Sequence, residues 1–261
     1  MHLYETIAVN HSHASENRIH DDDVAQRYGF RGALVPGVAV FGYMTHPMVA
    51  THGTDWLGDS VVSTRFFKPA YDGDRLSIRM EPRADGLDVT CSNASNELLA
   101  ELRCSVPAEP SAPDARWRVP GAATRAPRVE IASEAIELDT PFSAIHWVPT
   151  GAENRTYTER VADDLEVYAT GVVHPHLILH YSNQALVNRF VMPTWIHTGS
   201  ELRFRRLLRV GDEIEVRAIP TEKWVRKGHE FVKLQLAYVV EGAPAVEVTH
   251  TAIYKVAPRS A

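Results

Sequence analysis

The sequence predicts an α+β protein built from two copies of one unit, each with a long helix packed against an antiparallel sheet. Three observations predict this. Short blocks of sequence recur in the same order, a proline-rich stretch separates the copies, and each copy has one long helical pattern followed by strand-like runs. A helix segregated to one face of an antiparallel sheet is typical of the α+β class.

The repeated blocks lie at an almost constant distance along the chain, between 137 and 139 residues. The matching pairs are Glu16–His20 with Glu153–Tyr157, Gly32–Val40 with Gly171–Leu179, Trp56-Leu57 with Trp195-Ile196, Arg65-Phe66 with Arg203-Phe204, and Gly73-Asp74 with Gly211-Asp212. Two copies at this spacing indicate a duplicated domain and not a solenoid, which needs more repeats.

Residues 107–127 separate the copies and contain five prolines: Pro107, Pro110, Pro113, Pro120 and Pro127. Proline lacks an amide donor and has a fixed φ, so this stretch is predicted to be an extended connector. The boundary is placed near residues 120–130. We expect one domain over residues 1–120 and a second over residues 128–261.

In the first copy, Leu3–Val9 is predicted as a strand and Asp22–Tyr28 as a short helix, capped by one of its aspartates, with Asp22 favoured. Pro36–Val49 is predicted as the long amphipathic helix, because its apolar residues are spaced by three and four; Pro47 is expected to end or kink it. The strands that follow are predicted over Ser60–Phe67, Arg75–Glu81, Gly86–Ser92 and Leu98–Val106.

The second copy repeats this order. A strand is predicted over Ser143–Val148 and the long helix over Pro175–Val191, with a proline where its missing donor costs nothing. The later strands are predicted over Ser200–Arg206, Glu213–Ile219, Glu230–Val240 and Val246–Val256.

Composition excludes several classes of function. The net charge of −6 gives no basic footprint, so we expect no nucleic-acid partner. No apolar run is long enough to span a bilayer, and the start of the chain does not resemble a signal peptide, so no membrane partner is expected. Cys91 and Cys104 form neither a disulfide framework nor a metal knuckle, which predicts a reduced, cytoplasmic setting.

Two stretches carry a family resemblance. Arg65–Pro69 with Gly73-Asp74 predicts a strand, a proline that ends pairing, and a turn into the next strand. Upstream lie Asn17-Arg18-Ile19-His20, Gly29-Phe30 and Leu34-Val35-Pro36-Gly37. Together they resemble the MaoC-like (R)-specific enoyl-CoA hydratases and dehydratases, most clearly over residues 15–80 and more weakly over residues 150–217. The resemblance implies a tandem double hot-dog fold, in which each antiparallel sheet wraps a central helix.

In that family, a histidine and an aspartate handle water and a proton on the 2-enoyl or 3-hydroxyacyl chain of a thioester. The resemblance therefore implies His20 as general acid and base and the Gly37 amide as donor to the thioester carbonyl. Val35, Phe41 and Tyr43 are expected in the substrate-binding wall. The implied partner is an acyl-CoA or acyl-carrier-protein substrate, with no cofactor and no metal.

The motif departs from the family at two positions. Arg18 stands where the family has a proline after the asparagine. Ser15 stands where the family has its aspartate, so Ser15 and Asn17 are expected to orient the water, with Glu16 or a residue of Asp21–Asp23 as another source of a carboxylate. Asn17 has a structural alternative, which is to tie the loop to the backbone. The second copy has Ala152, Asn154 and Tyr157 at these positions and is expected to be the degenerate half.

Other functions stay open at this point. A hot-dog thioesterase and a non-catalytic acyl-thioester binding protein are the alternatives. His174, His176 and His180 suggest a metal site only weakly, because no HExxH pattern is present. The basic stretch Lys223–Lys227 is expected between strands, either meeting coenzyme A phosphates or solvated. The duplication supplies the pair that single-domain relatives make by dimerising, which favours a monomer of two repeats or a homodimer.

Overall fold

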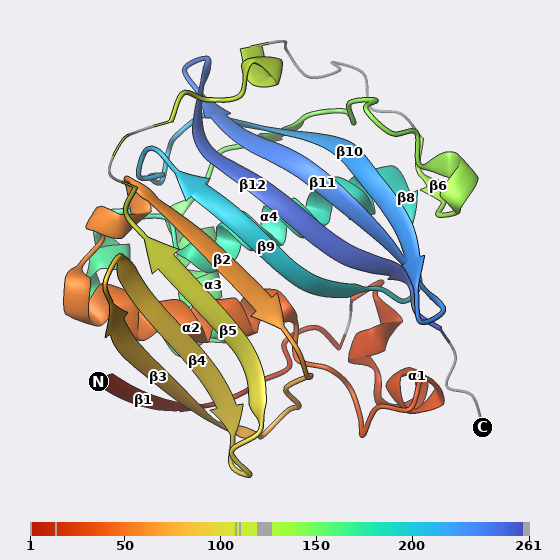
Figure 1. The fold of residues 1–261 in the computed structure, drawn as a ribbon, viewed down its shortest axis with the longest axis horizontal. Coiled ribbons are helices and arrows are strands. Elements are labelled where there is room, and N and C mark those ends of the chain that lie inside the picture. Colours follow the sequence, from red (N-terminus) through yellow and green to blue (C-terminus); the bar gives the residue numbers. More distant parts are fainter. Residues whose placement is uncertain (1, 14, 108, 110, 119–126, 258–261) are drawn as a thin grey trace.

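A ten-stranded antiparallel sheet runs through the whole protein (Figure 1). The structure is a computed structural model and describes residues 2–13, 15–107, 109, 111–118 and 127–257. The strands lie in the order β1-β3-β4-β5-β2-β9-β12-β11-β10-β7. Their bounds are β1 His2–Ile7, β2 Ser60–Phe66, β3 Arg75–Arg83, β4 Gly86–Asn93, β5 Leu98–Ser105, β7 Ile145–Trp147, β9 Ile196–Phe204, β10 Ile214–Arg226, β11 His229–Val240 and β12 Ala243–Lys255.

The order of the strands is the same in both halves when it is counted from the two outer edges toward the middle. We call β1–β5 with their helices the first half and β7–β12 with their helices the second half. In each half, a short edge strand pairs with the first strand of a three-stranded meander, and the strand that follows the long helix lies innermost. This is the double hot-dog fold that the sequence predicts.

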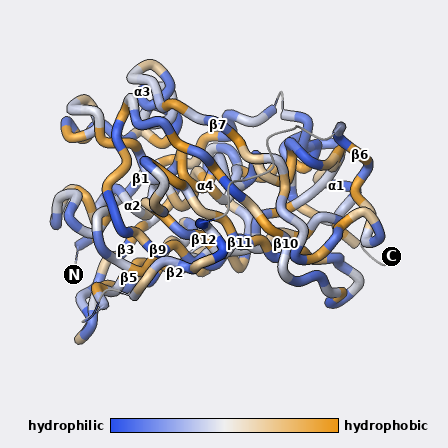
Figure 2. Tube along the Cα trace, turned by 90° about the horizontal axis from the view of Figure 1, so that it is seen from above, coloured by the Kyte–Doolittle hydropathy of each residue, from blue (hydrophilic) through white to orange (hydrophobic). Residues whose placement is uncertain are grey.

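Two long helices, α2 (Gly37–His52) and α4 (Pro175–Arg189), cover one face of the sheet and contact each other (Figure 1). The shorter helices are α1 (Asp22–Arg27) and α3 (Gly151–Arg160), and a small parallel pair is formed by β6 (Val129–Glu130) and β8 (Phe190–Val191). Along the strands, hydrophobic and hydrophilic residues alternate, and the outer turns are largely hydrophilic (Figure 2). The buried side chains of β3, such as Leu76 and Ile78, belong to one core cluster with Phe41 and Met44 of α2, so the apolar face of the sheet is the one that the helices cover.

Helix α2 differs from its prediction in two ways. It continues through Pro47 to His52, and nearly every residue between Val38 and Val49 is buried, so it has no amphipathic stripe. The sheet lies on one side of the helix and α4 with the loops of the second half on the other, which explains the burial all round. Burial of this much apolar surface outweighs the one hydrogen bond that proline removes.

One helix was not predicted, and two strands differ from their predicted bounds. The repeat of the first-half loop at Glu153–Tyr157 is helical, in α3, where the Thr150 hydroxyl accepts from the Glu153 amide at 3.1 Å. Thr150 followed by Glu153 is a capping-box pattern that predicts a helix start. Strand β9 begins at Ile196, four residues before the predicted start. Strand β10 continues to Arg226, so most of the basic stretch Lys223–Lys227 is paired with β11.

The two halves are joined where β2 pairs with β9, from Ser60 opposite Phe204 to Arg65 opposite Gly199. The backbones approach closely at the end of this register. A Cβ on Gly199 would lie 2.7 Å from the carbonyl oxygen of Thr64, which is a fixed backbone atom. Residue 199 must therefore be glycine for the joint to keep its present geometry.

We expect Gly199→Ala to lower the free energy of unfolding by about 1–3 kcal/mol, because the added methyl group forces the two strands apart. Gly151→Ala is the matched control, since a Cβ at Gly151 has no neighbour within 4 Å. Urea denaturation of both variants measures the difference. Equal stability of the two variants would show that the joint tolerates the methyl group.

Candidate functional site

The segment between β1 and α2 carries the motif residues and is tied to the second half by Asn17. The Asn17 side chain oxygen accepts from the Trp195 amide at 3.1 Å, and its nitrogen donates to the Trp195 carbonyl at 2.9 Å. The Arg18 amide adds a bond to the Pro193 carbonyl at 2.8 Å. Asn17 thus pairs with the backbone just before β9 and holds the loop at the junction of the two halves. This is the structural role considered for Asn17 in the sequence analysis, in which its side chain ties the loop to the backbone.

His20 lies in the 3-10 turn Arg18–His20 and is 9% exposed. Its Nδ1 lies 2.6 Å from the Leu34 carbonyl oxygen, which can only accept, so Nδ1 carries the proton. Its Nε2 lies 3.3 Å from the Asn17 side-chain nitrogen, which donates, so Nε2 carries the lone pair. Burial lowers the pKa of His20, and the imidazole is neutral with a basic nitrogen at ordinary pH.

Three adjoining cavities lie around the start of α2, and His20 lines two of them. A polar cavity of about 290 Å³ lies toward α4, an apolar cavity of about 270 Å³ lies toward β2 and β9, and an inner cavity of about 40 Å³ lies between them. The polar and inner cavities share Asn17, His20, Pro36, Asn183 and Trp195. The apolar and inner cavities share Leu34, Val35, Gly37, Ile196 and His197. The inner cavity exceeds the space that one buried water molecule needs.

Helix α2 begins at the inner cavity with two free amides. Among the described residues, neither the Gly37 amide nor the Val38 amide has a hydrogen-bond acceptor, whereas Ala39 and Val40 both donate to the Pro36 carbonyl. The first amides of a helix carry partial positive charge and attract an oxygen that gains negative charge. Gly37 has no side chain, so an oxygen atom can approach this end of the helix closely.

The remaining motif residues lie at different distances from His20. Val35 lines the inner and apolar cavities together with Gly37. Phe41 and Tyr43 line none of the three cavities and are fully buried in the core; the Tyr43 hydroxyl accepts from the Val9 amide. The expectation that these two form the substrate wall is corrected, because α2 is enclosed on all sides and only its first turn reaches the cavities.

Ser15 and the nearby carboxylates lie outside the inner cavity. The Ser15 hydroxyl accepts from the Asn17 amide at 3.1 Å and lines the polar cavity. Glu16 also lines the polar cavity, where it forms a forked ion pair with Arg128 at 2.6 and 3.2 Å. Of the described residues around the inner cavity, none is aspartate or glutamate. The family's carboxylate is therefore not replaced from another direction.

Asp21 and Asp22 hold the loop in shape. The Asp21 side chain caps α1 by accepting from the Val24 amide, so the expectation that Asp22 is the cap is wrong. Asp22 turns away from the helix and accepts from the Ala33 amide at 2.7 Å. It thereby fixes the backbone that leads into α2.

Two polar residues of the second half were missed by the sequence reasoning. Asn183 of α4 lines the polar and inner cavities, and its buried side-chain oxygen has no hydrogen-bond partner among the described residues. His197 of β9 lines the inner and apolar cavities. Neither belongs to a repeated block or a motif, and only the fold brings them opposite His20.

The corresponding region of the second half is filled. The His176 amide, which stands where Gly37 stands in the first half, donates to the ring of His174 at 3.1 Å, and Tyr157 replaces His20 and packs against His176. Asn154 repeats Asn17 by binding the backbone, with its side chain bonded to the carbonyl of Val172 and the amide of His174. No helix amide is left free for a ligand there.

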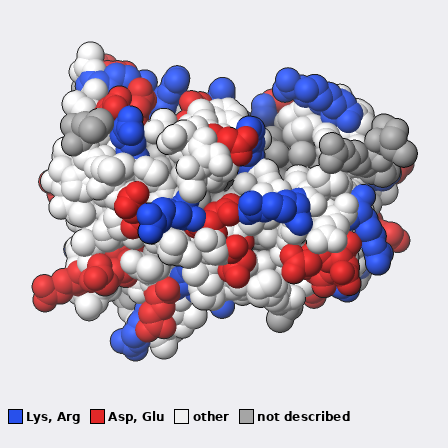
Figure 3. All heavy atoms as spheres, turned by 90° about the horizontal axis from the view of Figure 1, so that it is seen from below, with Lys and Arg blue, Asp and Glu red and all other residues white. Residues whose placement is uncertain are grey.

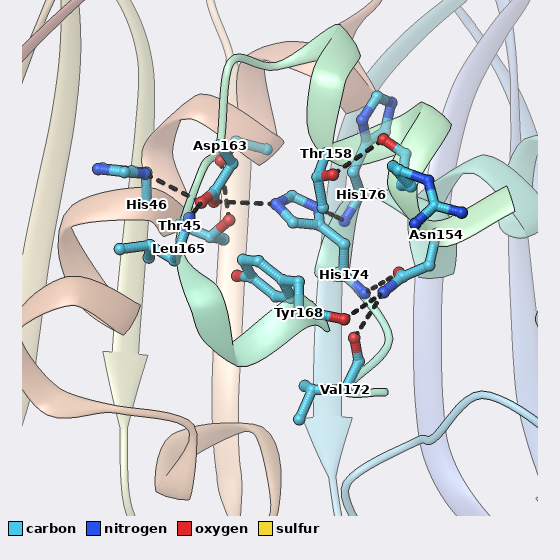
Figure 4. Close-up of polar contacts among 12 residues, drawn as sticks. Thr45, His46, Asn154, Thr158, Asp163, Leu165, Tyr168, Val172, His174 and His176 are labelled. Atoms are coloured by element: carbon cyan, nitrogen blue, oxygen red, sulfur yellow. Dashed lines mark hydrogen bonds and ion pairs between the residues drawn. The ribbon is translucent and has the colours of Figure 1, made fainter. Parts of the chain in front are cut away.

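A buried carboxylate bridges the halves in this region. Asp163 lies 3.1 Å from the His174 ring and 3.2 Å from the His46 ring, and Figure 4 shows it between the two. Because His174 Nδ1 accepts from the His176 amide, its proton is on the nitrogen that faces Asp163. Burial alone would raise the pKa of Asp163, but the two imidazoles outweigh it and hold the pKa at about 2. We call these three residues the Asp163 bridge.

The Asp163 bridge predicts a pH dependence of stability. A carboxyl whose folded pKa is depressed stabilises the fold above its unfolded pKa, and the effect is lost as the pH falls through the folded value. We expect the free energy of unfolding of the wild type to fall between about pH 4 and pH 2. Asp163→Asn should lack this pH dependence, and its free energy of unfolding at pH 7 should be lower by about 1–3 kcal/mol. Urea denaturation across this range measures both. A parallel pH profile of wild type and variant would contradict the assignment.

On the face drawn in Figure 3, basic and acidic side chains are interspersed and form no extended basic stripe. Within the described ranges, no group of three or more histidine, cysteine, aspartate or glutamate side chains is arranged to hold a metal ion. Every helix described is also too short or too polar to cross a bilayer.

No protein-family model matches the sequence, and no curated protein matches it. Solved structures do match, over nearly the whole chain. A protein described as a MaoC-domain dehydratase, from Chloroflexus aurantiacus, has a TM-score of 0.57 and 14% identity over 99% of this chain and 94% of its own. A Mycobacterium tuberculosis protein described as having a double hot-dog fold has a TM-score of 0.58 and 15% identity over 97% and 95%.

A protein described as an oleoyl thioesterase, from Lactobacillus plantarum, is also similar, with a TM-score of 0.54 and 11% identity over 99% of this chain and 98% of its own. These comparisons confirm the double hot-dog fold and the resemblance in fold to MaoC-like proteins. Because dehydratases and thioesterases both occur among them, the choice of chemistry depends on the residues of this site.

Proposed function

We propose that this protein reversibly adds water to 2-enoyl thioesters and forms 3-hydroxyacyl thioesters, with coenzyme A or an acyl carrier protein as the thiol. One observation carries the proposal: a neutral imidazole with its lone pair on Nε2 and a free helix amide line the same inner cavity. His20 supplies the base and Gly37 the carbonyl donor. The fold similarity to MaoC-like dehydratases supports this assignment.

In the forward direction, a water molecule in the inner cavity replaces the long contact between Asn17 and His20 Nε2. Its oxygen forms a bond to Cβ while His20 Nε2 takes one of its protons, and the electrons of the Cα–Cβ double bond move toward the thioester oxygen. The Gly37 amide stabilises the resulting enolate. The His20 imidazolium then gives a proton to Cα, which completes the addition of water and restores the neutral ring.

The other groups at the inner cavity support this step. The unpartnered side-chain oxygen of Asn183 accepts a hydrogen bond from the second O–H of the water. In MaoC-like enzymes, the aspartate beside the histidine would orient the water in this way. Ser15 shapes the loop through Asn17 and does not touch the water. The polar and apolar cavities provide space on the two sides of the thioester for the acyl chain and the thiol carrier.

Hydrolysis is the second candidate, because a thioesterase shares the fold. A hot-dog thioesterase needs a carboxylate near the thioester carbonyl. Among the described residues, none lines the inner cavity, and Glu16, which lines the polar cavity, is paired with Arg128. This favours hydration. Release of free thiol from saturated acyl-CoA would instead identify a thioesterase, and retention of ligand affinity without turnover in either assay would identify a binding protein.

Incubation with crotonyl-CoA and with medium-chain and aromatic enoyl-CoA tests the proposal, with loss of the enoyl absorbance as the readout. We expect His20→Ala to lower kcat/KM by about 10²–10⁴-fold, the usual contribution of a general base. His11→Ala is the matched control, because His11 lies in the same segment, is exposed and lines none of the three cavities. A wild type inert on every enoyl thioester, or a fully active His20→Ala variant, would refute the proposal.

The pH profile tests the protonation state of His20. Burial lowers its pKa, so the base remains unprotonated below the ordinary imidazole value of about 6.5. We expect kcat/KM to stay constant as the pH falls from 8 to 6.5 and to decline only at lower pH. A decline centred at or above pH 6.5 would show that another group, or a solvated imidazole, acts as the base.

A further inference from the structure

Three polar side chains form a buried chain behind the inner cavity, on the face of the sheet that the helices cover. His197 Nε2 lies 2.8 Å from the Ser200 hydroxyl, and the same hydroxyl lies 2.9 Å from His250 Nδ1. The two imidazole rings also stack, with centroids 4.3 Å apart. His197 and Ser200 belong to β9 and His250 to the neighbouring β12, so the sheet register fixes all three.

The other nitrogen of His197 faces the start of α2. His197 is 5% exposed, and its Nδ1 has no hydrogen-bond partner among the described residues. A Cβ built on Gly37 would lie 3.5 Å from this nitrogen and 3.4 Å from the Phe66 ring, so the nitrogen faces Gly37 on the side where glycine has no side chain. The His197 ring also lines both the inner and the apolar cavities.

The Ser200 hydroxyl determines which nitrogen of His197 carries the proton. A hydroxyl has one hydrogen, so it can donate to only one of the two imidazoles and accepts from the other. If Ser200 donates to His197 Nε2 and accepts from His250 Nδ1, the proton of His197 is on Nδ1. A carbonyl oxygen near Gly37 can only accept, so its binding selects this arrangement.

We propose that His197 is a second hydrogen-bond donor to the thioester carbonyl, beside the Gly37 amide, and that Ser200 and His250 are positioning residues that fix its tautomer. The identity of the carbonyl rests on the proposed function. His197 donates a hydrogen bond from Nδ1 and keeps its proton throughout, so the proton transfers remain those of His20. The site would thus be composite, with the base from the first half and a carbonyl donor from the second.

The surroundings of His197 suit a neutral donor. Burial lowers the pKa of His197 to about 3, and burial also lowers the pKa of His250, so neither ring carries charge at working pH. A neutral imidazole can polarise a carbonyl by donating a hydrogen bond, as triosephosphate isomerase shows. Two buried nitrogens of this chain have no hydrogen-bond partner among the described residues, His197 Nδ1 and His250 Nε2. Of the two rings, only that of His197 lines a cavity in which a ligand could accept a hydrogen bond.

Substitution of His197 and Ser200 tests the proposal kinetically. We expect His197→Ala to lower kcat on crotonyl-CoA by about 10²–10³-fold, as loss of one carbonyl donor does, with KM changed less than about threefold. Ser200→Ala should lower kcat about tenfold and Ser200→Thr, which keeps the hydroxyl, should restore it. His176→Phe is the control, since His176 is a buried histidine of the same half that lines none of the three cavities.

Ring-nitrogen NMR supplies a readout that needs neither turnover nor a folded variant of His197. Wild-type protein labelled with ¹⁵N-histidine is titrated with 2-oxopentyl-coenzyme A, a thioether ketone whose carbonyl takes the place of the thioester. The His197 signals are assigned through their splitting pattern and their response to Ser200→Thr. We expect the Nδ1 resonance of His197 to shift as the ketone saturates the site.

The outcomes separate the two proposals. Hydration by wild type with kcat unchanged in His197→Ala and Ser200→Ala would overturn the role of His197 and leave the proposed function standing. A shifted His197 resonance in a protein that turns over no enoyl thioester would support the carbonyl site and refute hydration. A ketone that binds without moving the His197 resonance overturns the inference, whatever the fate of the variants. A ketone that fails to bind to a protein that hydrates crotonyl-CoA also overturns it and leaves the proposed function standing.

Discussion

The pairing of the Asn17 side chain with the Trp195 backbone is the interaction on which the candidate site depends. It spans the two halves, and its two hydrogen bonds hold the motif loop against the start of β9. The Asn17 side chain pairs with both the N–H and the C=O of Trp195, as the backbone of a neighbouring strand would, and so leaves neither buried group without a hydrogen bond. It holds the loop that carries His20 against the strand that carries His197, while the bond from His20 to the Leu34 carbonyl keeps the ring beside the segment that leads to Gly37.

The duplication explains why one site is open and the other is closed. Both halves have the same strand order and the same asparagine that ties a loop to the backbone. In the first half, the residue at the helix start is Gly37, and the amide beside it is free. In the second half, His176 occupies that position, and its amide is bonded to His174, which in turn donates to Asp163. The side chains that close this half also form a buried bridge to α2.

This asymmetry has a consequence for chemistry. The inner cavity is lined by groups from both halves: His20 and Gly37 from the first, Asn183 and His197 from the second. A single half would therefore supply the imidazole of His20 but lack half of the polar groups that face it. In the linked pair, the second half has Tyr157 at the position of His20, and the first half keeps its open cavity.

Much of the fold was predictable from local patterns. The repeated blocks and the alternation along the strands predicted the α+β duplication, because both can be recognised from the order of the residues without any knowledge of tertiary contacts. The bounds of elements that depend on tertiary contacts could not be predicted in this way. Helix α2 runs through Pro47 because it is enclosed, and β9 starts early because it pairs with β2. Of the residues that line the candidate site, His20, Val35 and Gly37 followed from the motif. Phe41 and Tyr43 were expected there but lie in the core. Asn183 and His197 line the site and belong to elements that carry no motif.

The most direct measurement is a crystal structure of the protein soaked with a non-hydrolysable ketone analogue of 3-hydroxybutyryl-CoA. The account predicts that the carbonyl oxygen lies about 2.7–3.1 Å from the Gly37 nitrogen, with the substituent on Cβ within hydrogen-bond reach of His20 Nε2. A ligand bound in the second half, or one whose carbonyl lies away from the start of α2, would contradict it.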